Sequence, residues 1–313
     1  MIIGSVRSVT ASSLGFHLCA LLVAVLLMLN TARAAERPAV HNKAFWLALR
    51  ADGFKLPARE SALPLALEAA ALLGSTDPAL RDAVAYQALV TWIYEERRLD
   101  AGELDRLRAT LAASAKRGLG EGEADGLFLR SFSTLALSVL AAADLKQPFL
   151  DSQQFDGLVE LGIEGLVGER DLRGYVPGKG WGHATAHSAD LLKFLGRSHW
   201  LRPAQQARIV DAIAERLPSA GQVFVWGEDA RLAAALTSLA RRTDADPAAF
   251  DGWFERLREE HAAVWSGSFD PARYVPVRTQ LNALSAFAAD LEPVAGAAAT
   301  IRTAVLALRA AAQ

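Results

Sequence analysis

The sequence has little cysteine and no marked excess of charge. Cys19 is the only cysteine among 313 residues, and 33 Lys and Arg stand against 35 Asp and Glu. A disulfide framework is excluded, so stability must come from core packing, which a chain of this length can supply. Disordered chains have low hydrophobicity, whereas 52% of these residues are hydrophobic. Nucleic-acid-binding proteins usually have a basic excess, which this sequence lacks. We therefore expect a folded protein that does not bind nucleic acid.

Two common active-site motifs are also missing. Residues 118–122 and 178–180 are rich in glycine, but neither stretch has the spacing and the Lys-Ser or Lys-Thr pair of a phosphate-binding loop. The Gly-x-Ser-x-Gly turn that exposes the nucleophile of many serine hydrolases does not occur in the sequence. The sequence therefore predicts neither a nucleotide site of this type nor a serine hydrolase.

The first 34 residues have the organisation of a secretory signal. Arg7 precedes an apolar run from Leu18 to Leu29, and Ala32-Arg33-Ala34 follows as a cleavage motif. The run is shorter than the roughly 20 residues that span a bilayer, which disfavours an uncleaved anchor. Cleavage after Ala34 removes Arg7, Arg33 and the cysteine, which leaves 31 basic and 35 acidic residues and a formal charge of −4. We expect a periplasmic or secreted protein, with no later segment apolar enough to span a membrane.

Residues 35–313 show apolar side chains at helical spacing and almost no period-two alternation. Asp77 and Pro78 mark one helix start, because aspartate caps a first turn and proline is tolerated there. No linker rich in Pro, Gly or Ser divides this stretch, so we treat it as one domain. We predict an all-α fold of stacked antiparallel helix pairs, arranged as a HEAT-like solenoid or a helical toroid. The expected helices are one beginning at Pro78 and residues 101–115, 127–142, 154–167, 181–195, 203–217, 229–241, 247–265, 279–291 and 293 to the end.

A glycine-rich loop, residues 174–182, interrupts the helical pattern and leads directly into a helix. At 100° per residue, His183, His187 and Asp190 share one stripe of that helix, and the leucines that follow form a second stripe. Because the leucines must face the core, the histidines are expected at the edge of a cleft. Lys179 is expected on the same side if the helix begins early.

Two interpretations of the histidines remain open. His183 and His187, four residues apart, have the spacing of metal ligands on a helix, and Asp190 could supply a third ligand to a divalent metal. Ala184 stands where zinc proteases of this spacing carry a glutamate base, which disfavours that reaction. The alternative is structural, with both histidines bonded to main-chain carbonyls or to acids of neighbouring helices and holding the loop.

A second polar group follows Trp226. Glu228 and Asp229 stand at the start of a predicted helix, where acidic side chains favour the helix dipole and can act as caps. The functional alternative is a pair of carboxylates beside a tryptophan that holds a sugar ring, as in a glycosidase. We predict that His183 and His187 lie within about 15 Å of these acids, which would make one polar pocket.

Several stretches of the sequence resemble one protein family. They are residues 129–135, 171–192 and 227–232, together with Asp77-Pro78 and Arg81-Asp82. The resemblance, over about residues 60–310, is to a bacterial family known as domain of unknown function 2785 (DUF2785). The glycine-rich loop with its two histidines is the most distinctive part. The resemblance implies an all-helical fold and names no activity or substrate.

Two classes of function remain open. We favour a binding or scaffold protein, in which the glycine-rich loop and the histidines form a cleft for a small molecule or peptide. The alternative is a hydrolase-type enzyme, metal-assisted or carbohydrate-acting, that uses the histidines and Asp190 with Glu228 or Asp229. Binding is favoured because no complete catalytic set is visible in the sequence. The candidate cleft residues are Arg173, Lys179, Trp181, His183, His187, Asp190, Trp226, Glu228, Asp229 and Arg231.

Overall fold

The computed structural model of the protein describes residues 41–292 and 295–311. Residues from Lys43 onward form one compact unit. The predicted signal segment lies outside the described residues, together with Cys19 and the cleavage site after Ala34. The predicted start of the last helix at residue 293 also lies outside them.

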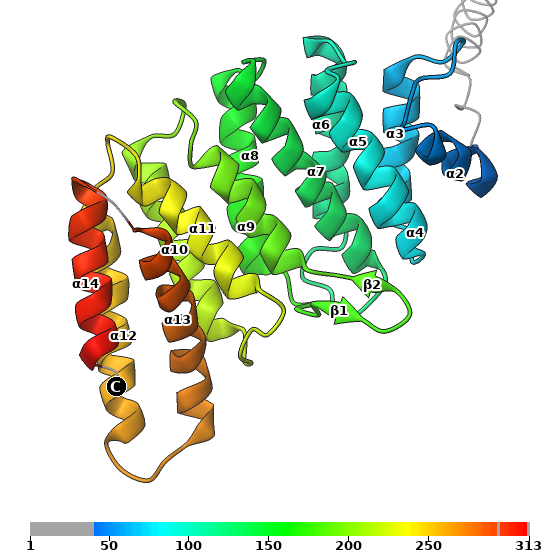
Figure 1. Ribbon diagram of the computed structural model, residues 1–313. Helices are drawn as coiled ribbons and strands as arrows, with labels where there is room; N and C mark the ends of the chain where they lie inside the picture. The colour runs from blue at the N-terminus through cyan, green and yellow to red at the C-terminus, as the bar shows by residue number, and fades with distance from the viewer. Residues whose placement is uncertain (1–40, 293–294, 312–313) are drawn as a thin grey trace, which may run out of the picture. The chain divides into compact units, whose positions relative to one another are not determined.

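The fold of the described residues is all-α, as the sequence predicts (Figure 1). The π-helical segments η1 (Arg81–Tyr86) and η2 (Thr91–Glu95) join α4 (Pro78–Leu80) and α5 (Gln87–Val90) into one helical stretch. Asp77 caps this stretch by accepting a hydrogen bond from the Ala79 amide at 2.9 Å. The other helices are α2 (Lys43–Ala51), α3 (Ala62–Leu72), α6 (Ala101–Lys116), α7 (Gly126–Lys146), α8 (Ser152–Gly168), α9 (Ala184–Leu195), α10 (Pro203–Ser219), α11 (Glu228–Ala240), the 3₁₀ helix η3 (Pro247–Phe250), α12 (Asp251–Trp265), α13 (Pro271–Asp290) and α14 (Ala297–Ala311).

The helices between α3 and α13 alternate between two rows. One row contains α5, α7, α9, α11 and α13, and each of these helices packs against the next member of the row. The helices α3, α6, α8 and α10 form the second row in the same way. Helices that follow one another in sequence also pack across the rows, α6 on α7 and α8 on α9 (Figure 1). α12, which belongs to neither row, packs on α13.

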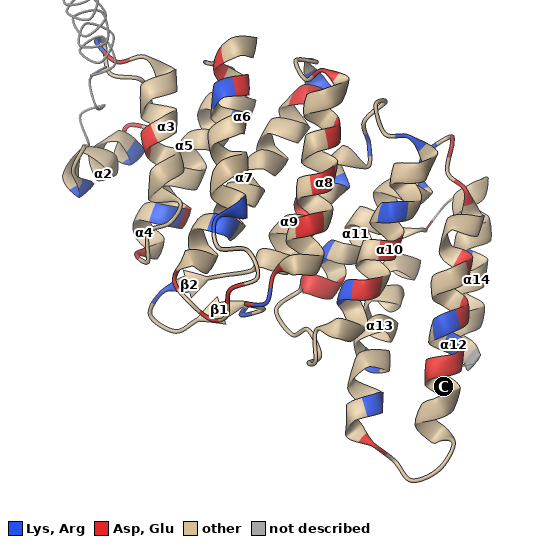
Figure 2. Cartoon of the chain, turned by 180° about the vertical axis from the view of Figure 1, so that it is seen from behind, with Lys and Arg blue, Asp and Glu red and all other residues tan. Residues whose placement is uncertain are grey.

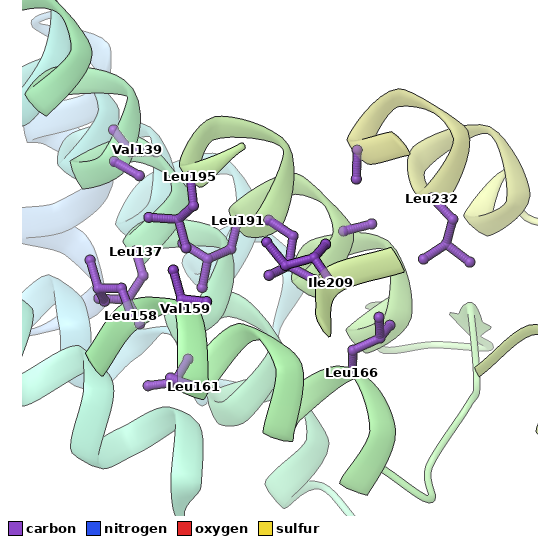
Figure 3. Close-up of a cluster of buried hydrophobic side chains, with 14 of the residues drawn as sticks. Leu137, Val139, Leu158, Val159, Leu161, Leu166, Leu191, Leu195, Ile209 and Leu232 are labelled. Atoms are coloured by element: carbon purple, nitrogen blue, oxygen red, sulfur yellow. The ribbon is translucent and has the colours of Figure 1, made fainter. Parts of the chain in front are cut away.

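Apolar side chains fill the space between the rows. Figure 3 shows Leu191 and Leu195 of α9 among the buried leucines and valines of α7 and α8. Full burial of one such side chain contributes about 1.5–3 kcal/mol to the free energy of unfolding. The prediction that the leucines of α9 face the core is confirmed.

α7 corrects one prediction about the membrane. Among the described helices, it alone is long and apolar enough to cross a bilayer, so the prediction that no segment after the signal passes this test is wrong. Most of its apolar stretch is buried inside the protein, where α6 and α9 pack against it. The composition of α7 is therefore accounted for by its place in the core.

The start of two helices differs from the prediction. α9 begins at Ala184 and not at Trp181, because the preceding residues pair as a β-hairpin. α13 begins at Pro271, earlier than residue 279, because Asp270 caps the Ala272 amide and the helix continues through Pro276. Proline normally disfavours a helix interior, which is why the sequence pattern hides this first part of α13. The structure also contains α2 and α3, which are not among the helices predicted from the sequence.

Candidate functional site

The glycine-rich loop folds into a two-stranded hairpin beside the start of α9. β1 (Tyr175–Val176) pairs antiparallel with β2 (Gly180–Trp181), and Tyr175 lies opposite Trp181. Gly178 and Gly180 have φ angles of 75° and 80°. This left-handed conformation costs a residue with a side chain about 1–2 kcal/mol. Glycine has no Cβ atom and adopts this conformation without that cost.

The two other glycines of the loop allow close packing. A Cβ atom on Gly174 would lie 2.1 Å from Cδ1 of Trp226, and one on Gly182 would lie 2.6 Å from Cδ2 of Leu127. Neither contact is possible for a real side chain without movement of its neighbours. The hairpin therefore sits directly on Trp226 at one point and on α7 at another.

Basic side chains fix the hairpin to the preceding helices. The buried Arg81 donates hydrogen bonds to the carbonyl oxygens of Lys179 at 2.7 Å and Ser75 at 2.8 Å. Its guanidinium also lies over the Phe128 ring, 4.2 Å from the centroid. The Lys179 ammonium pairs with Asp125 at 2.6 Å, so Lys179 turns toward the start of α7 and not toward the histidines.

His183 caps α9 in an unusual conformation. Its φ is 55°, in the left-handed region that few residues with a side chain adopt. Its Nε2 atom lies 3.0 Å from the carbonyl oxygen of Trp226 and 3.8 Å from a carboxylate oxygen of Glu228. Burial lowers the pKa of His183 below its usual value, although Glu228 acts in the opposite direction. Because a carbonyl can only accept, His183 donates its Nε2 proton to Trp226. His183 and Glu228 therefore lie within the predicted 15 Å, at 3.8 Å.

His187 is buried and has a different partner. Its Nδ1 atom lies 2.7 Å from the Ser131 hydroxyl, which in turn donates to the carbonyl oxygen of Gly182. Because a carbonyl can only accept, the Nδ1 proton of His187 points to the serine oxygen. Burial lowers the pKa of His187 to about 3, so the ring is neutral at pH 7. The prediction that His187 lies at the edge of a cleft is wrong, because its ring packs against Phe132 inside the protein.

The predicted metal ligands do not converge. Within the part of the chain that the structure describes, no group of three or more His, Cys, Asp and Glu side chains is arranged to hold a metal ion. Asp190 is bonded to Lys193 at 2.9 Å and pairs with Arg231. The proposed set of His183, His187 and Asp190 is therefore wrong, and the structural interpretation of the histidines accounts for their contacts.

Glu228 and Asp229 serve the local backbone. Glu228 is buried and accepts a hydrogen bond from the Trp226 amide at 3.0 Å. Asp229 accepts one from the Ala230 amide at 2.9 Å. Both carboxylates thus stabilise the turn and the first residues of α11, which fits the capping interpretation better than an acid–base pair.

Three exposed aromatic side chains gather where the hairpin meets the loop before α11. We call Tyr175, Trp181 and Trp226 the aromatic platform. Their exposed fractions are 45%, 39% and 48%. The ring centroid of Tyr175 lies 5.2 Å from that of Trp181 and 6.1 Å from that of Trp226, and the two tryptophans are 5.9 Å apart. Tyr175 is not among the site residues predicted from the sequence, although a pairing across the glycine turn would have placed it beside Trp181.

A polar hollow of about 370 Å³ adjoins the platform. Figure 2 shows that the segment between α8 and β1, which borders the hollow, carries both acidic and basic residues. Arg173 is held there by Asp171, with Nε–O and Nη2–O distances of 2.8 Å and 2.5 Å. Neither histidine lines this hollow. Its lining residues are Glu123, Arg170, Leu172, Arg173, Gly174, Tyr175, Ala220, Gln222 and Trp226.

Comparison with known proteins identifies one family and no characterised relative. No curated protein and no solved structure matches the chain significantly. A family model described as "Protein of unknown function (DUF2785)" matches residues 115–284, which include the hairpin, both histidines and the aromatic platform. This range is narrower than the resemblance in the sequence suggests. The chain belongs to the DUF2785 family of proteins of unknown function.

Proposed function

We propose that this protein is a binding protein that holds its ligand on the aromatic platform. The observation that carries the proposal is the gathering of three large aromatic side chains that are each more than one-third exposed. Exposed tryptophan and tyrosine rings offer large contact areas that lose little conformational entropy on binding, and they are enriched at binding surfaces. Such a cluster beside a polar hollow has the composition of a ligand site.

The platform is held in place before any ligand arrives. The Trp181 ring stacks on His183 with centroids 4.6 Å apart. Trp226 rests on Gly174, while its amide bonds to Glu228 and its carbonyl accepts from His183. Groups that are already ordered lose less entropy on binding, so this fixation supports a binding role.

The hydrolase alternative is less well supported by the same contacts. His187 is buried and bonded to Ser131, and Asp190 is paired with Lys193 and Arg231. Glu228 is 2% exposed and accepts from the backbone, so it is poorly placed to meet a substrate. General acids and bases must reach the reacting group, and these side chains instead hold the platform.

The proposal includes the HEAT-like arrangement of the helices. The alternation of helices between two rows, with each helix packed on the next in its row, supports a solenoid of helix pairs. Proteins of this architecture commonly bind partners or ligands on surfaces shared by successive pairs. The platform adjoins the starts of α9 and α11, which are neighbours in one row.

The proposal also places the protein outside the cytoplasm. The arginine, the apolar run and the Ala32-Arg33-Ala34 motif of the first 34 residues support export and cleavage. A periplasmic or secreted binding protein meets small solutes and peptides, whereas nucleic acid is not expected as a partner.

An array of oligosaccharides and short peptides tests the proposed function. We expect the wild-type chain to bind at least one probe, and Trp226→Ala to lose that binding. Trp265→Ala is the matched control, because Trp265 on α12 is 59% exposed and does not belong to the platform. Equal binding by both variants, or no binding by the wild type, would contradict the proposal. A thermal melt of each variant shows whether it is folded.

A further inference from the structure

We propose that the ligand of the aromatic platform is an acidic oligosaccharide, a chain of sugars that carry carboxylate groups. This inference rests on the proposed function and names the class of its ligand. The sugar rings stack on the platform, and a carboxylate enters the polar hollow beside it. This ligand class is supported by the continuity of the two surfaces, by the exposed parts of the rings and by one arginine.

The platform and the polar hollow form one continuous surface. Tyr175 and Trp226 belong to both, and Gly174 also lines the hollow. A ligand larger than one ring can therefore touch the aromatic side chains and the polar lining at the same time. This continuity favours an extended ligand with both apolar faces and polar groups.

The tryptophans favour sugar rings over a peptide. His183 stacks on one face of Trp181, and Trp226 packs on the backbone of Gly174, so each ring has one side covered and remains partly exposed. The apolar C–H face of a sugar can stack on the exposed part of such a ring. A peptide bound by strand addition needs a longer exposed strand than β1 or β2, which have two residues each.

Arg170 favours a carboxylate on that sugar. Its side chain is exposed and lines the polar hollow, and no carboxylate among the described residues pairs with its guanidinium. Arg173, by contrast, is bonded to Asp171. A guanidinium binds a carboxylate through two parallel hydrogen bonds, which makes Arg170 the group that would select an acidic sugar.

Calorimetric titration with three probes tests this inference. The probes are hexagalacturonate, the neutral cellohexaose and a hexaglutamate peptide. We expect hexagalacturonate to bind the wild-type chain most tightly, and Arg170→Gln to weaken that binding by about tenfold or more. Arg170→Lys keeps the charge without the two parallel bonds, so its loss should be smaller. Arg106→Gln is the matched control, because Arg106 is an exposed arginine of α6 outside the site.

The possible results separate the inference from the proposed function. Equal affinity for cellohexaose and hexagalacturonate, or no effect of Arg170→Gln, overturns the acidic-sugar inference and leaves a Trp226-dependent binding protein. Tightest binding of hexaglutamate overturns it in favour of a peptide ligand. No binding of hexagalacturonate also overturns it. Hexagalacturonate binding that survives Trp226→Ala contradicts the platform itself and therefore both proposals.

Discussion

The imidazole of His183 joins the start of α9 to the turn before α11, because its Nε2 atom lies 3.0 Å from the carbonyl oxygen of Trp226. The ring also stacks on Trp181, with centroids 4.6 Å apart. One side chain therefore touches both tryptophans of the platform. Its removal should change stability and the geometry of the platform together.

We expect His183→Ala to lower the free energy of unfolding by about 1–3 kcal/mol, because the Trp226 carbonyl loses its donor. Urea denaturation followed by circular dichroism measures this change. His183→Asn is the control for backbone strain, because asparagine tolerates the left-handed conformation of residue 183 better than alanine does. If His183→Ala unfolds at the same urea concentration as the wild type, the hydrogen bond contributes nothing to stability.

Stability should fall as the pH falls from 7 to 5, because of His187. Burial lowers the pKa of His187 to about 3, whereas the unfolded chain has the ordinary value of 6.5. Below pH 6.5 the unfolded chain takes up a proton that the folded chain does not, which favours unfolding. The expected slope from this residue approaches about 1.4 kcal/mol per pH unit. Urea denaturation at several pH values measures it.

His187→Gln separates this effect from the titration of other groups. The variant has no imidazole at position 187, so its stability should depend less on pH between 7 and 5 than that of the wild type. Burial also lowers the pKa of His183, so a smaller dependence of the same sign should remain. Identical pH profiles for the two proteins would mean that His187 is not the neutral, buried group that its contacts indicate.

Gly178→Val should destabilise the protein by about 1–3 kcal/mol through backbone strain. Gly178 has a φ of 75°, and no atom lies within 4 Å of the position that a Cβ would occupy. A loss of stability in this variant would therefore come from the backbone conformation and not from steric contact. Gly178→Asn should be affected less, because asparagine adopts positive φ more readily. If both variants melt like the wild type, the turn does not require glycine.

The mature protein should begin at Ala35. The motif Ala32-Arg33-Ala34 predicts cleavage after Ala34, following export of the chain. Edman sequencing of the protein recovered from the periplasm or medium identifies its first residue. A chain that keeps Met1 and sediments with membranes would show that the apolar run is an anchor.

Most helices could be predicted from the sequence because their signals are local. Asp77 and Pro78 start α4 through contacts within two residues, and Asp100 bonds to the amide of Glu103 in the same turn of α6. Such caps, together with leucines at helical spacing, lie within a few residues of each other in the chain. The all-α class and most helix ranges therefore follow from the sequence.

The site depended on contacts between residues far apart in the chain. His183 and Trp226 are 43 positions apart, and Ser131 and His187 are 56 apart. The sequence predicts that the helix begins at Trp181. In the structure, the pairing of Tyr175 with Trp181 and the hydrogen bond from Arg81 to the Lys179 carbonyl favour a hairpin instead. Only tertiary packing decides between these local alternatives, because the free energies that separate them come from side chains of other helices.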